Sequence, residues 1–87
     1  MEDVVEVTNA SYVGDYTLFV TFSDGLSAQI DFLRWIEKYP FFAPLKDIAY
    51  FKNFKIDGWT VSWPNGADIA PETLHEIAVQ QERLQVA

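Results

Sequence analysis

The sequence predicts a small α+β domain, in which an antiparallel sheet of two hairpins carries helices on one face in the order β-β-β-α-(α)-β-β-α. Residues 16–22 and 26–31 alternate apolar and polar side chains around an Asp-Gly turn, which is the period of half-buried strands. Residues 32–38 and the segment from Pro71 onward have helical spacing instead. A chain of 87 residues is long enough for one domain with one modest core.

The first three strands are expected near the amino terminus. Residues 4–13 are rich in valine and tyrosine, which favours a strand. The next two strands form a hairpin, and only a three-residue loop over 23–25 places Leu26 opposite Phe22 on the core side. In that loop Gly25 takes the left-handed conformation.

The middle of the chain is expected to be helical. Residues 32–38 place apolar and charged side chains on opposite sides of a helix, and Asp31 stands at the N-cap, where a carboxylate accepts bonds from free amides. Pro40 prevents the helix from continuing. An apolar connector follows, and residues 46–52 are expected to add a short second helix.

The last third predicts a second hairpin and a final helix. A two-residue loop at Asp57-Gly58 pairs Ile56 with Trp59 in a type I′ turn. Pro71 suits the first turn of the helix because its missing N–H is harmless there, and Glu72 suits the positive end of the helix dipole. The buried stripe of this helix is expected to comprise Leu74, Ile77, Ala78 and Leu84.

Charge narrows the classes of partner. Thirteen acidic residues against six basic ones give a formal net charge of −7. The cations are interpreted as scattered singly, so neither direct nucleic-acid binding nor docking on a membrane is expected. A small basic protein is the expected partner. A second copy of the chain is the other, because a small domain gains core by associating.

Composition also excludes several kinds of chemistry. The chain has no cysteine, so it has no disulfide, thiolate metal site or thiol nucleophile. The first residues lack the pattern of a signal peptide, and no apolar run approaches the roughly 20 residues that cross a bilayer. We expect a cytoplasmic protein without a cofactor or metal.

Four titratable residues are the candidates for a metal site or an acid–base centre: Asp24, Asp31, Asp68 and the single histidine, His75. Each aspartate also has a local use in a turn, a cap or a helix start, where a side-chain oxygen contributes about 1 kcal/mol. His75 is expected on the solvated side of its helix. No serine lies in a nucleophile motif, so we predict that the chain is not an enzyme.

Aromatic residues are numerous for this length, with seven Phe, four Tyr and three Trp. A core this small does not hold every ring centrally, so we expect an exposed aromatic patch that meets another chain. Trp35, Tyr39 and Phe42, with the acidic residues near them, are the predicted interface.

Two segments are distinctive together: residues 16–25 followed by Asp31, and the stretch Trp-Pro-Asn-Gly-Ala-Asp-Ile-Ala-Pro-Glu-Thr-Leu over 63–74. Through them, nearly the whole chain resembles the bacterial family known as domain of unknown function 2442. The second segment is the more specific one. The residues of the family pattern, predicted to be structural, are Asp24, Gly25, Asp31, Trp63, Pro64, Asn65, Gly66, Asp68, Pro71 and Glu72.

The resemblance implies an α+β fold and a bacterial origin, but no catalytic residue or cofactor. Members of the family are often encoded beside another small protein, an arrangement similar to toxin–antitoxin pairs. The expected function is therefore a protein-interaction domain, of the acidic antitoxin-like kind. The alternatives are a self-associating structural domain and, less favoured, a small carboxylate-based enzyme or metal-binding domain.

Overall fold

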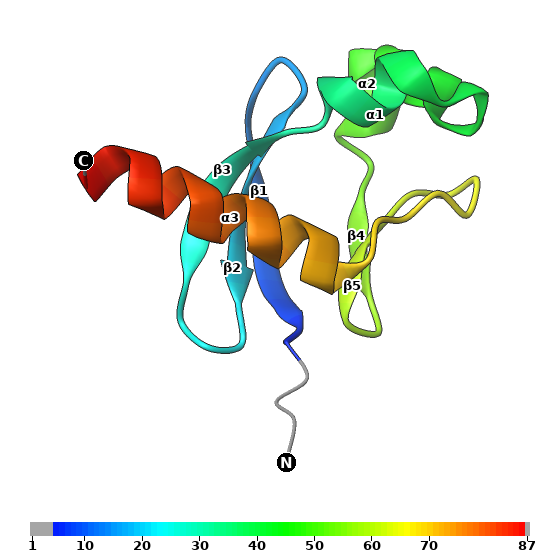
Figure 1. Ribbon diagram of the computed structural model, residues 1–87. Helices are drawn as coiled ribbons and strands as arrows, with labels where there is room; N and C mark the ends of the chain where they lie inside the picture. Colours follow the sequence, from blue (N-terminus) through cyan, green and yellow to red (C-terminus); the bar gives the residue numbers. More distant parts are fainter. Residues whose placement is uncertain (1–4, 87) are drawn as a thin grey trace.

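A three-stranded sheet, a separate hairpin and four helical segments make up the protein (Figure 1). The computed structural model describes residues 5–86 and, within them, the side chains as far as Glu82. The elements are β1 (Val7–Gly14), β2 (Thr17–Phe22), β3 (Ser27–Asp31), α1 (Leu33–Lys38), the 3₁₀ helix η1 (Pro40–Lys46), α2 (Ile48–Phe51), β4 (Lys55–Asp57), β5 (Thr60–Ser62) and α3 (Pro71–Val86). The predicted α+β class and element order are confirmed.

The first sheet has the strand order β1-β2-β3, and its second hairpin has the predicted register. Leu18 lies opposite Ile30 and Val20 opposite Ala28. The Phe22 amide donates to the Leu26 carbonyl at 2.8 Å, and Gly25 has φ +93°. The three-residue loop is thus confirmed, since a two-residue loop would put the apolar residues of the two strands on opposite faces.

The β4–β5 hairpin differs from its prediction. Asp57 pairs with Thr60 and Ile56 with Val61, so the loop consists of Gly58 and Trp59, and the predicted pairing of Ile56 with Trp59 is wrong. Gly58 takes φ +75° at the first loop position, while Trp59 has no positive φ, which fits a type II′ turn and excludes type I′.

The position of Trp59 explains why the hairpin register differs from the predicted one. Its ring is 60% exposed, whereas the predicted register required it in a strand. Its carbonyl accepts a hydrogen bond from the Val7 amide at 2.9 Å, so the loop is attached to β1. The two hairpins therefore form two sheets joined at this point, not one continuous sheet.

The helices gather in two places (Figure 1). Helix α3 crosses the sheet against β3, while α1, η1 and α2 form a compact group near one end of it. The N-cap of α1 is Phe32 and not the predicted Asp31, because the helix begins one residue later than predicted; Asp31 Oδ1 still accepts from the Leu33 amide at 2.9 Å. The apolar connector proves to be η1, and α2 is the expected second short helix.

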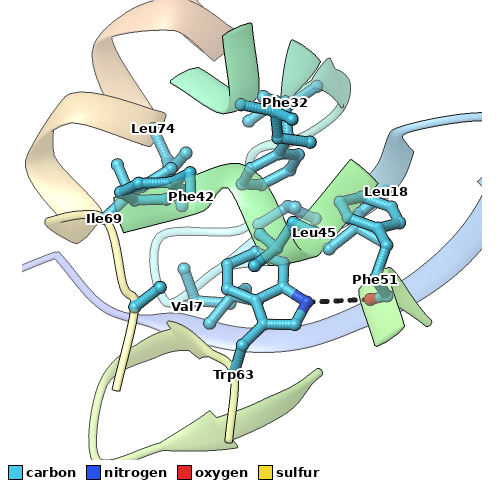
Figure 2. Packing of buried hydrophobic residues seen from close by; sticks show 14 of the residues in the cluster. Val7, Leu18, Phe32, Phe42, Leu45, Phe51, Trp63, Ile69 and Leu74 are labelled. Carbon is cyan, nitrogen blue, oxygen red and sulfur yellow. Dashed lines mark hydrogen bonds between the residues drawn. The ribbon is translucent and has the colours of Figure 1, made fainter. Parts of the chain in front are cut away.

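Trp63 lies at the centre of the single core. Figure 2 shows its indole Nε1–H donating to the Phe51 carbonyl, a bond of 2.8 Å, among apolar side chains from the helices and the sheet. Leu74 and Ala78 of α3 are buried and Ile77 is partly buried, as predicted. The Leu84 side chain lies outside the described residues. The core therefore draws residues from the three-stranded sheet, the helices and β5, whereas β4 is exposed along its length.

Candidate interaction surface

Residues 33–51, comprising α1, η1 and α2, form what we call the helical lobe. Phe42, Leu45 and Phe51 bury its inner side in the core, and the Tyr16 hydroxyl donates to the Lys46 carbonyl. The lobe presents its other side to solvent. All three residues of the predicted interface belong to this lobe.

The structure places the three predicted interface residues differently. Tyr39 is 46% exposed, whereas Phe42 is only 9% exposed and belongs to the core. Trp35 is half-buried against the Phe32 ring, with centroids 5.3 Å apart. Tyr39 thus suits contact with another chain, Trp35 offers part of its ring, and Phe42 has little surface to offer.

Phe41 is the exposed ring that the sequence-based prediction left out of the interface. It is 58% exposed, and the Tyr39 and Phe41 centroids lie 6.4 Å and 6.2 Å from that of Phe42. Tyr39 and Phe41, which we call the aromatic patch, therefore flank one buried ring. Nothing in the sequence separates Phe41 from Phe42, because η1 is too short to show a period.

Charge is segregated along the chain, contrary to the interpretation that the cations are scattered. Residues 34–55 contain five of the six cations and only two carboxylates, Glu37 and Asp47. This segment comprises most of the helical lobe and the chain that leads from it to the start of β4. This segment carries a formal +3, and the rest of the chain carries −10. Counting charge segment by segment would have found it.

Three of these cations lie over aromatic rings. The Arg34 guanidinium is 5.4 Å from the Trp35 ring centroid, and the Lys38 ammonium is 5.7 Å from that of Tyr39. Lys52 similarly covers the half-buried ring of Tyr12, at 5.1 Å. Of the three, only Lys38 lies over a ring of the aromatic patch, where cation–π attraction holds its positive charge close.

A histidine–aspartate pair lies elsewhere, between α3 and the β2–β3 loop. His75 Nε2 is 2.7 Å from Asp24 Oδ2, and Asp24 Oδ1 accepts from the Leu26 amide at 3.0 Å. The imidazole also meets the Phe22 ring edge-on, with centroids 5.0 Å apart. His75 is therefore partly buried, and the expectation that it is a solvated helix residue is wrong.

The surroundings of Asp24 favour its carboxylate form. The Leu26 amide, and after it the His75 imidazole, hold the pKa of Asp24 below its ordinary value of 3.8. Both hydrogen bonds go to the ionised carboxylate, which they stabilise relative to the acid. The pair therefore fastens the loop to the helix.

The other candidate carboxylates do not converge with this pair. Asp31 bonds the Leu33 amide, and Asp68 is exposed and pairs through its backbone with Ser62. Among the side chains that the structure describes, no group of three metal-ligating residues comes together. The geometry of Asp24 and Asp31 supports the local structural roles that the sequence predicted for them.

The Trp-Pro-Asn-Gly segment forms a tight turn that supports the helical lobe. Asn65 Oδ1 accepts from the Ala67 amide at 3.0 Å, and its Nδ2 donates to the Phe41 carbonyl at 3.2 Å. Gly66 provides φ +89°. Asn65 therefore ties this turn to the backbone of the aromatic patch, a link that sequence spacing could not predict.

The comparison with protein families covers most of the chain. The family model for the protein of unknown function DUF2442 matches residues 7–80, a span that includes both hairpins, the helical lobe and most of α3. The chain belongs to this family. Comparisons of the DUF2442 domain with curated proteins and with solved structures returned no match. None of its described helices is both long and apolar enough to span a membrane.

Proposed function

We propose that this DUF2442 domain is a protein-interaction domain that acts as the acidic, antitoxin-like member of a two-protein system in the bacterial cytoplasm. One observation carries the proposal: Tyr39 and Phe41 are neighbouring exposed rings on the helical lobe. Exposed aromatic side chains are frequent anchors of binding energy because they bury a large area at small entropic cost. The proposal assigns the domain no catalytic step.

The charge distribution defines the partner further. The net charge of −7 attracts a protein that is basic overall and speeds its encounter. At the aromatic patch, however, Lys38 lies over the ring of Tyr39, and its positive charge favours carboxylates on the facing surface of the partner. The partner is therefore a small basic protein whose contact surface includes an apolar anchor beside acidic groups.

Co-expression tests the proposal. The chain is produced together with the product of the adjacent gene, and the mass of the purified species is measured by light scattering. A stoichiometric complex is expected for the natural chain. The double variant Tyr39→Ala/Phe41→Ala should lose it, whereas Trp59→Ala should keep it, because Trp59 is equally exposed but lies on the β4–β5 loop.

Other outcomes are equally informative. A complex that survives the double variant would move the interface away from the helical lobe. A lone monomer with the neighbour left behind would remove the two-protein role. A homodimer that is lost in the double variant would instead favour the self-associating alternative, with the aromatic patch as its interface.

A further inference from the structure

The outer edge of β3 is open. Strand β1, at the other side of the sheet, donates the Val7 amide to the Trp59 carbonyl of the β4–β5 hairpin, but β3 is the last strand of the order β1-β2-β3. In the part of the chain that the structure describes, no strand pairs with this edge. An open edge is a template for another strand.

The register shows which backbone groups face outward. Phe22 and Leu26 form a hydrogen-bonded pair, and in an antiparallel ladder such pairs alternate with non-bonded ones. Leu26 and every second residue after it therefore bond β2. Ser27 and Gln29, between them, direct their N–H and C=O groups away from the sheet, where an added strand would meet them.

Space for a strand lies beside this edge. A groove of about 600 Å³ runs between β3 and α3, and its walls include Ala28, Ala78, Gln81 and Glu82. The two alanines have small side chains and leave room in the groove, which Ser27 and Gln29 also line. Figure 1 shows α3 crossing the sheet beside β3. The outward backbone groups thus open into a groove and not against a flat surface.

The charge of the groove selects its occupant. Glu82 lines it, Asp31 ends the strand, and Asp24 lies exposed in the loop just before it. No lysine or arginine is among the described residues of its walls. A second copy of β3 would bring no cation to the groove, because the strand contains none, whereas a basic segment would be attracted.

We propose that the β3 edge binds an extended basic segment of a partner protein as an added strand. Backbone hydrogen bonds to Ser27 and Gln29 supply the pairing, as in other cases of strand addition. Glu82 and Asp31 select lysine or arginine in the segment. This site is separate from the aromatic patch and does not depend on it.

The test uses the natural chain labelled with nitrogen-15 and a capped peptide of about ten residues, long enough to cover the strand, in which lysine alternates with threonine. The expected result is saturable shifts at the Ser27 and Gln29 amides, with slower hydrogen exchange. The same peptide with glutamate for lysine should not bind. Binding of both peptides alike, or shifts confined to other elements, would overturn the proposal.

Two perturbations separate strand pairing from simple charge attraction. N-methylation of the lysine peptide at one alternating set of residues should abolish binding, while methylation of the other set should leave it unchanged, since only one set faces β3. Gln29→Pro removes an outward amide but no bond to β2. It should weaken binding about tenfold, and Gln29→Val should not.

The remaining outcomes also support or overturn strand addition at β3. Circular dichroism and thermal unfolding confirm that Gln29→Pro is folded; if it is not, the methylated peptides give the answer on the natural chain. Equal binding of both methylated peptides would contradict strand addition. A homodimer whose Ser27 and Gln29 amides are protected without peptide would show that a second copy occupies the edge, against the proposal.

Discussion

His75 Nε2 lies 2.7 Å from Asp24 Oδ2, and this contact joins α3 to the β2–β3 loop across 51 positions of the sequence. It gives stability a dependence on pH. The pKa of Asp24 is lower in the folded chain than its ordinary value of 3.8, so the unfolded chain takes up the proton first as the pH falls. The stabilisation is therefore complete above that ordinary value and is lost as the pH falls through the folded pKa.

Asp24→Asn checks this dependence. We expect the variant to unfold at lower urea concentration than the natural chain at pH 7, and the difference to shrink below about pH 4. Asp15→Asn, at another exposed turn position where asparagine tolerates the positive φ of 48°, is the control and should show no comparable change. A difference between Asp24→Asn and the natural chain that stays constant down to about pH 2 would contradict the assigned role.

Replacing Trp63 by phenylalanine should destabilise the core. The variant keeps an aromatic ring but removes the indole donor that bonds the Phe51 carbonyl, and leaving a buried acceptor without its donor costs about 1–3 kcal/mol. Urea titration measures the loss. Trp59→Phe, on an exposed ring, should stay within about 0.5 kcal/mol of the natural chain.

Two substitutions separate the contributions of the two hydrogen bonds that Asn65 makes. Asn65→Asp keeps the Oδ1 acceptor for the Ala67 amide but loses the donor to the Phe41 carbonyl, while Asn65→Ala loses both. We expect Asn65→Ala to cost about 2 kcal/mol and Asn65→Asp about half of that. Hydrogen exchange in η1 should rise in both variants. Unchanged exchange there would mean that Asn65 serves only its own turn.

Gly25 tests the three-residue loop. A methyl group at this position would have no neighbour within 4 Å, but φ is +93°, so Gly25→Ala should cost about 1–2 kcal/mol from the backbone alone. Gly14→Ala is the matched control, because that site is equally open and has no positive φ. Equal melting temperatures for the two variants would argue against the loop conformation.

The two hairpins show when sequence alternation suffices. Strands β2 and β3 have six and five residues, so their apolar faces exclude the two-residue loop in favour of the three-residue one. Strands β4 and β5 have three each, which is too short for alternation to choose between two positions of Gly58 in the loop. The hydrogen bond from Val7 to Trp59 chooses between them, and it joins residues far apart in the sequence.

The candidate sites were harder to predict, because they depend on contacts between residues far apart in the sequence. The aromatic surplus predicted exposed rings without saying which ones, and Phe41 and Phe42 are indistinguishable until Phe42 packs into the core. The link between His75 and Asp24 joins segments whose approach only the folded chain determines. The positive charge of residues 34–55, in contrast, needs only a count along the sequence.

The hydrogen bond from Asn65 to the Phe41 carbonyl involves the backbone of the aromatic patch and no atom of its rings. The hydrogen bond that holds this surface to the turn therefore does not depend on which side chains occupy positions 39 and 41. Recognition and folding are separable here: new rings or charges at these two positions would change the partner while the turn continues to hold the lobe in place. The domain is accordingly a ready starting scaffold for designed binding specificity.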